Sequence, residues 1–228
     1  MRSQSQVILA LDTSTRNVGI ALHNGFRVLY ESSWTSQDYH TAELAPAIYD
    51  ALQKAKIEID EIGAISIAIG PGSFTGLRVG LALAKGLAII RHLPLISVPT
   101  LDIYAAAQPP LTIPLVAVLR AGRGKYAVSW FQMMNGCWEQ NEKIELLTLI
   151  ELAERILVPT LVCGELTEEE RIFLKHKHSF AQLASPAQCV RRPAVLAEIG
   201  WNLWQEKKLA DPITLTPIYL HLNEPIPG

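Results

Sequence analysis

The sequence predicts an α/β protein built from two related lobes. The first half reads as three strands, a helix, a strand and a helix, and the second half repeats this order more faintly. The proline-rich segment "QPPLT" at 108–112 interrupts the pattern between the two halves. A doubled βββαβα order therefore predicts two lobes, each with a sheet covered by helices.

The first lobe should begin with a buried strand, "VILALDTS" at 7–14, followed by two further strands at 18–24 and 26–34. Asn24-Gly25 is a strong hairpin signal, because both central residues of a type I′ turn need positive φ. A helix over 41–55 has apolar residues at helical spacing, and "AISIAIG" at 64–70 is apolar throughout, as in a parallel strand buried on both faces. A helix over 75–91 and a short strand over 93–99 complete the lobe.

The second lobe should contain three strands, at 113–121, 125–133 and 137–147. We then expect a helix at 149–157, a strand at 160–164 and a charged helix at 167–176. A last helix over about 190–207 and an extended, proline-rich tail follow. The predicted organisation is an N-terminal lobe at 1–108, completed by the helix at 190–207, a C-terminal lobe at 109–189, and a tail at 208–228.

The composition is that of a well-packed globular protein. It is 49% hydrophobic and 18% charged, with a net charge of −2, which argues against disorder and against a large electrostatic footprint for nucleic acid. The three cysteines have no C-x-x-C spacing, so reduced thiols in a cytoplasmic protein are expected. We expect no signal peptide and no membrane-spanning segment.

The first stretch that could carry chemistry is the end of the opening strand. Asp12 there is followed by Thr13 and Ser14, whose hydroxyls and amides could receive phosphate oxygens while the carboxylate holds Mg²⁺ through water. The alternative is that these side chains simply cap a β-turn. Spacing alone favours the alternative.

The second stretch is the turn "GPGSFTG" at 70–76, between a strand and a helix. Gly72 and Ser73 could contact an anion at the free amides of the helix, and Ser73 can cap the helix. The turn is neither G-x-x-x-x-G-K-[ST] nor G-x-G-x-x-G, so neither a Walker loop nor a dinucleotide site is implied.

The helix after this turn has a ridge of small residues, Gly76, Gly80, Ala84 and Ala88, every four positions. Such a ridge lets another helix approach closely. It could instead pack on the protein's own sheet. Because a second apolar stripe lies on another side of the helix, the pattern favours a protein interface.

The remaining polar motifs are weaker. "LRAGRGKYAV" at 119–128 carries Arg120 and two further cations among glycines, where a solvated turn is the default and an anion contact the alternative. No H-x-x-x-H, H-E-x-x-H or G-x-S-x-G pattern occurs, so neither a metal site nor a nucleophile is predicted.

The stretches "ILALDTSTRNVGIAL", "HTAELAPAIYDAL" and above all "IAIGPGSFTGLRVGLALAKGLA" resemble the TsaB (YeaZ-type) family. The resemblance covers about the first hundred residues strongly, then weakens, and returns as "PIYL" at 217–220. It implies the actin-like, sugar-kinase and Hsp70 ATPase (ribonuclease H-like) fold. It also implies a non-catalytic paralogue of TsaD that supports, with TsaD and TsaE, threonylcarbamoyl transfer to the adenosine beside the anticodon of tRNAs reading codons that begin with A.

The resemblance further implies that the helices at 41–55 and 75–91 bind TsaD, or a second copy of the chain when TsaD is absent, and that tRNA is met only through the complex. No cofactor is implied, although ATP or ADP at the partner interface stays open. On these helices the expected interface residues are Leu44, Ile48, Ala51, Leu77, Gly80, Leu81, Ala84 and Ala88. Leu81→Glu should then disrupt the complex and leave the fold intact.

Two positions depart from the family pattern. Arg120 stands where the family has an acidic residue, and His221 stands where it has an arginine. Arg120 would repel a metal ion, which argues against the alternative function, an active small-molecule kinase or ATPase of this fold. A metallopeptidase, a third class, has no motif to support it.

Overall fold

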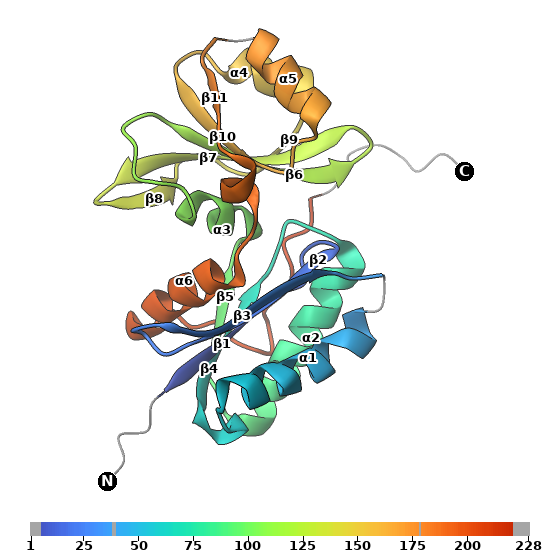
Figure 1. Cartoon of the computed structure of the whole chain (residues 1–228), viewed down its shortest axis with the longest axis vertical. Helices are drawn as coiled ribbons and strands as arrows, with labels where there is room; N and C mark the ends of the chain where they lie inside the picture. Colours follow the sequence, from blue (N-terminus) through green and yellow to red (C-terminus); the bar gives the residue numbers. More distant parts are fainter. Residues whose placement is uncertain (1–5, 38–39, 178, 221–228) are drawn as a thin grey trace. The chain divides into compact units, whose positions relative to one another are not determined.

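The computed structural model describes residues 6–37, 40–177 and 179–220, which divide into two compact units (Figure 1). Unit 1 runs to Ile103 and takes up the chain again from Arg191 to Pro217. Unit 2 contains Tyr104–Val190 and begins again at Ile218. The helix α6 (Pro193–Gln205) thus belongs to the unit that begins the chain.

Unit 1 is built on a five-stranded sheet with the order β3-β2-β1-β4-β5. The first three strands form an antiparallel meander, whereas β1, β4 and β5 are parallel. The strands are β1 (Val7–Asp12), β2 (Asn17–His23), β3 (Val28–Thr35), β4 (Ile62–Ala68) and β5 (Leu95–Val98). The predicted hairpin between β2 and β3 is confirmed, but not its type I′ turn. Gly25 has a φ of +85°, whereas Asn24 lacks a positive φ and its amide donates to the Arg27 oxygen across the turn.

Helices cover both faces of this sheet, which is why β1 and β4 are apolar at successive positions. On one face, Leu9 and Leu11 of β1 share a core with α1 (His40–Ala55) and α2 (Phe74–Arg91). On the other face, Ile8 and Ala10 pack with α6. The period of two along β1 therefore separates two cores. The structure also contains a short helix η1 (Ile59–Glu61) and α3 (Thr100–Ala106).

Unit 2 has a six-stranded sheet with the order β11-β10-β6-β7-β8, to which β9 adds by pairing with β7. Its core combines residues of β6, β7 and β10 with Leu152 and Leu174 from the two helices. The elements are β6 (Leu115–Gly122), β7 (Lys125–Met134), β8 (Cys137–Gln140), β9 (Glu145–Thr148), α4 (Leu149–Arg155), β10 (Thr160–Gly164), α5 (Glu168–Lys177), β11 (Ala181–Leu183) and η2 (Pro186–Cys189).

The predicted strand at 137–147 is wrong as a single element. It is two strands that pair with different halves of β7: β8 lies along Phe131–Met134 and β9 along Lys125–Val128. The segment between them, 141–144, has no regular structure. Within the described residues, no helix is both long enough and apolar enough to span a membrane.

Candidate functional site

The carboxylate of Asp12 is buried at the end of β1 and is fully engaged by its own chain. The Nε atom of Arg191 donates to Oδ2 at 2.8 Å, and both side chains are 3% exposed. The other oxygen, Oδ1, accepts the Ser14 amide at 2.9 Å and the Ser14 hydroxyl. Each carboxylate oxygen thus accepts a hydrogen bond, and the Arg191 guanidinium compensates the negative charge.

Arg191 is held at this position by further contacts to the same turn. Its Nη2 atom donates to the hydroxyl of Thr15 and to the backbone oxygen of Asn17, the latter at 3.3 Å. Sequence reasoning missed Arg191, because a partner 179 residues away leaves no local signal. A magnesium ion bound through Asp12 would have to displace this guanidinium, so the residues present do not fit that ion.

The glycine-rich turn before α2 lies directly against the Asp12 turn. The Ser73 amide donates to the Ser14 backbone oxygen at 2.6 Å, and a Cβ on Gly72 would come within 2.1 Å of that oxygen. The Ser73 hydroxyl accepts the Gly76 amide at 3.2 Å, which confirms Ser73 as the cap of α2. The structure therefore brings the predicted phosphate-contact residues together, but as two turns bonded to each other.

Thr13 joins the same turn to the ridge of α2. Its hydroxyl donates to the Gly76 backbone oxygen at 2.8 Å, and a Cβ on Gly80 would lie 2.0 Å from that hydroxyl oxygen. Since Thr13 and Gly80 are both buried, the small ridge of α2 packs on the end of β1. Of the two explanations for the ridge, packing on the protein's own sheet accounts for Gly80.

The side chains predicted to meet a partner are all buried within unit 1. Gly80 is buried, and each of the other seven residues is at most 6% exposed. The full set is Leu44, Ile48, Ala51, Leu77, Gly80, Leu81, Ala84 and Ala88. A partner on these helices would meet their outward faces instead. The expected effect of Leu81→Glu is accordingly corrected, because a charge at this core position would destabilise the fold itself.

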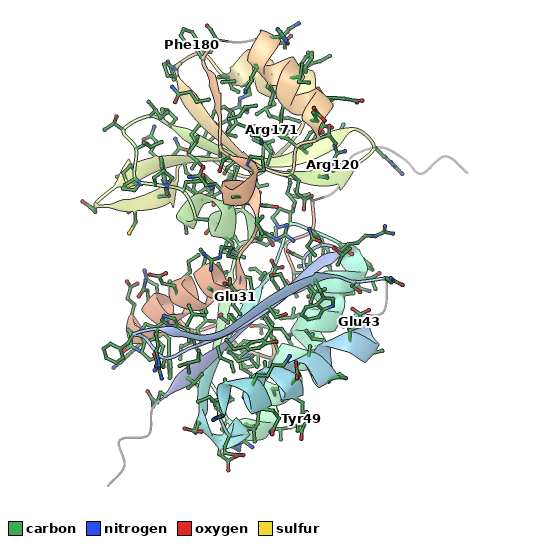
Figure 2. The ribbon with its side chains drawn as sticks, viewed as in Figure 1. Glu31, Glu43, Tyr49, Arg120, Arg171 and Phe180 are labelled. Carbon is green, nitrogen blue, oxygen red and sulfur yellow. The ribbon has the colours of Figure 1, made fainter. Side chains whose placement is uncertain are left out.

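The outward faces of α1 and α2 carry exposed apolar side chains. Phe74, Ile89 and Ile90 of α2 are 55%, 53% and 79% exposed, and Tyr49 of α1 is 66% exposed. Figure 2 labels Tyr49 on α1. Gly86 lies on α2 with no atom within 4 Å of a Cβ built on it. Close packing against Thr13 requires a glycine at position 80, whereas no described residue of this chain lies close enough to require one at position 86.

The turn between β6 and β7 is solvated, in line with its default interpretation, and Gly122, Arg123 and Gly124 are exposed there. Arg120 forms an ion pair with Glu170 of α5, and the Tyr126 hydroxyl donates to the same carboxylate. Burial is the main cause that raises the pKa of Tyr126 well above its usual range, and the hydrogen bond to Glu170 adds to the effect. Arg120 therefore has a structural partner within unit 2.

Two remaining predictions concern metals and the tail. No group of three or more histidine, cysteine, aspartate or glutamate side chains placed to hold a metal ion occurs among residues 6–37, 40–177 and 179–220. His221 lies outside the described residues.

Comparison with known proteins identifies the family. The family model "TsaD: tRNA N6-adenosine threonylcarbamoyltransferase" matches residues 34–148. The Bacillus subtilis tRNA threonylcarbamoyladenosine biosynthesis protein TsaB is 30% identical over 221 residues, 95% of each chain. The TsaB protein of Escherichia coli is 33% identical over 138 residues, 59% of each chain.

A solved structure agrees with these sequence matches. YeaZ from Pseudomonas aeruginosa superposes with a TM-score of 0.76 at 22% identity, over 94% of this chain and all of that one. This likeness confirms the predicted α/β fold class, with two sheets in two units. Because a relative at 30% identity is matched over nearly its whole length, the chain belongs to the TsaB (YeaZ-type) family.

Proposed function

We propose that this chain is a non-catalytic subunit that binds TsaD and, with TsaE, supports threonylcarbamoyl transfer to the adenosine beside the anticodon of tRNAs reading codons that begin with A. Its family relatives are named as threonylcarbamoyladenosine biosynthesis proteins, which supports a role in making this modification. The observation that carries the non-catalytic part is the buried Asp12–Arg191 pair. The carboxylate that a kinase or ATPase of this fold would offer to a metal is here bonded to a guanidinium.

The proposed partner surface is the outward side of α1 and α2, defined by Tyr49, Phe74, Gly86, Ile89 and Ile90. Glycine inside a helix costs about 0.5–1 kcal/mol relative to alanine, and Gly86 has no neighbour that would exclude a methyl group. Close approach of a helix from another chain supplies a reason for it. The exposed apolar side chains beside it suit the desolvated centre of an interface. We propose the same surface for a homodimer when TsaD is absent.

The test is association of the full chain with TsaD from the same organism, measured by size-exclusion chromatography with light scattering. Gly86→Leu places a bulky side chain where this chain has open space, so the fold should survive and the complex should be lost. Ile90→Glu should act in the same direction, because it puts a charge into an apolar interface.

Phe26→Glu is the matched control. Phe26 is 96% exposed at the β2–β3 hairpin, so this variant carries the same kind of change at a position outside the proposed surface. It should form the complex normally. A wild-type chain that forms no complex with TsaD would refute the proposed function, whereas unchanged association of both α2 variants would refute the surface alone.

A further inference from the structure

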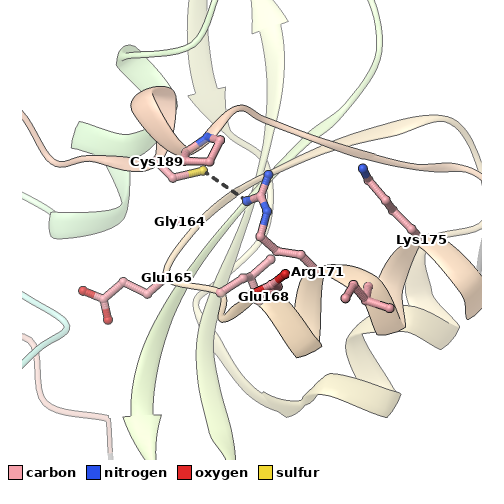
Figure 3. A pocket seen from close by; sticks show the side chains of 9 residues that line it. Gly164, Glu165, Glu168, Arg171, Lys175 and Cys189 are labelled. Carbon is pink, nitrogen blue, oxygen red and sulfur yellow. Dashed lines mark hydrogen bonds between the residues drawn. The ribbon is translucent and has the colours of Figure 1, made fainter.

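Unit 2 contains a cavity that the proposed function does not use. Its volume is about 630 Å³, within the range occupied by small-molecule ligands. It lies beside the turn that follows β10, the first turns of α5 and the end of η2 (Figure 3). The lining residues are Gly164, Glu165, Leu166, Glu168, Arg171, Ile172, Lys175, Pro186 and Cys189.

A thiol and a guanidinium meet in this cavity. Arg171 reaches from α5 toward Cys189, and its Nη1 atom lies 3.8 Å from the Cys189 sulfur (Figure 3). The same guanidinium donates through Nη2 to the Ala184 backbone oxygen, which fixes its position. The Cys189 sulfur itself lies 3.8 Å from the same Ala184 oxygen, so the sulfur and the guanidinium are held side by side at the cavity wall.

The lining of the cavity also carries charges of both signs. Lys175 lies one helical turn after Arg171, so two cations line the α5 side. Glu165 and Glu168 supply carboxylates at the beginning of the helix. Carboxylates of a ligand suit the cations, and an ammonium group suits the acids. The cavity thus matches a small zwitterionic peptide better than a simple anion.

The other two cysteines lack this combination and serve as internal standards. Cys163 is 0% exposed, and burial raises the pKa of its thiol well above the usual value. Cys137 is exposed on β8 but does not line the cavity. Exposure alone would make Cys137 the first cysteine to react, whereas the cavity would make it Cys189.

We propose that this cavity binds a small peptide disulfide carrying carboxylates and an ammonium group, with glutathione disulfide as the representative, and that Cys189 forms a mixed disulfide with it. The Cys189 thiol loses its proton to solvent, and the thiolate attacks one sulfur of the bound disulfide. The ligand's sulfur–sulfur bond breaks as the Cys189–glutathione bond forms. The second glutathione leaves as a thiolate with the electron pair.

The experiment treats the purified full chain with glutathione disulfide and, separately, with hydroxyethyl disulfide, a neutral disulfide without carboxylates. Peptide mass spectrometry then follows the adduct at each cysteine over time. With glutathione disulfide, Cys189 should react before Cys137, and its rate should saturate with concentration because binding precedes exchange. With the neutral disulfide, the Cys189 rate should rise linearly.

Lys175→Gln is the diagnostic variant, because Lys175 is exposed and its loss leaves the Arg171–Cys189 contact in place. It should slow the reaction of Cys189 with glutathione disulfide about two- to fivefold and leave the reaction with the neutral disulfide unchanged. Cys189→Ser should abolish the saturable adduct. Faster modification of Cys137 with both reagents, or equal effects of Lys175→Gln on both, would overturn the proposal.

Discussion

Arg191 donates to the carboxylate of Asp12 at 2.8 Å, and the two side chains are each 3% exposed although 179 residues separate them. This ion pair ties the segment before α6 to the end of β1. A buried pair of this kind contributes little net stability compared with an apolar pair, but its disruption leaves one charge without compensation.

Arg191→Met should therefore destabilise the protein by about 3–5 kcal/mol, measured by urea denaturation, because it leaves the Asp12 charge buried and unpaired. The double variant Asp12→Asn with Arg191→Met should lose less than Arg191→Met alone. Arg192→Met is the neighbouring control: its ion pair with Glu31 has an arginine that is 57% exposed, so a loss below about 1 kcal/mol is expected. Equal losses for Arg191→Met and Arg192→Met would contradict the assignment.

Gly80→Ala and Gly86→Ala should change stability in opposite directions, although both replace a glycine within α2. At position 80 the new methyl group would meet the Thr13 hydroxyl at 2.0 Å, and overpacking of this kind costs about 1–3 kcal/mol. At position 86 it would meet nothing within 4 Å, so the helix should gain about 0.5–1 kcal/mol. Thermal and urea unfolding of the isolated variants measure the difference. A tolerated Gly80→Ala would show that Thr13 does not fix the ridge of α2.

Asp102 should make the protein less stable as pH rises toward neutrality. Burial raises the pKa of this carboxyl from 3.8 to about 7 in the folded protein. Between these values the folded state holds the proton more tightly than the unfolded chain, so stability falls with rising pH and levels off above about pH 7. The fall is on the order of 4 kcal/mol at most, since one pKa unit corresponds to about 1.4 kcal/mol.

Asp102→Asn tests this linkage, because it removes the ionisable group and keeps the shape of the side chain. Urea denaturation at about pH 5 and about pH 8 should show a smaller decrease for the variant than for the wild type. The variant should also be the more stable protein at the higher pH. If both proteins lose the same stability between the two conditions, Asp102 is not responsible.

Magnesium and ATP should not stabilise the isolated chain through the Asp12 turn. A ligand that binds only the folded state raises stability by RT ln(1 + [L]/Kd), so binding would appear as a melting temperature that increases with ATP concentration. With Arg191 bonded to Asp12, we expect no such increase at millimolar ATP and Mg²⁺. A saturable increase that depends on Mg²⁺ would revive the kinase or ATPase alternative.

Local patterns were enough to predict much of the fold. Continuous apolar runs identify β1 and β4, Asn24-Gly25 identifies the hairpin, and Ser73 identifies the beginning of α2. The boundary between β8 and β9 was missed because both segments pair with the same strand, and pairing is not visible in one segment's composition.

The side of α2 that faces the sheet could not be predicted from the sequence, for a different reason. Two of its sides are apolar, so helical periodicity alone does not say which side faces the sheet. Contact between Gly80 and Thr13 decides it, and that contact depends on how the end of β1 meets the helix. In the same way, the role of Asp12 depends on Arg191, which the chain supplies only after all the residues from Tyr104 to Val190.

The discontinuous path of unit 1 has a consequence for synthesis on the ribosome. Arg191 follows Asp12 by 179 residues, an interval of about 9–36 s at about 5–20 residues per second. During that time Ile8 and Ala10 have no α6 to cover them, and the whole segment Tyr104–Val190 is made before α6 appears. The sheet that leaves the ribosome first thus stays without its α6 cover until late in synthesis, and this uncovered face is what a nascent-chain chaperone would meet.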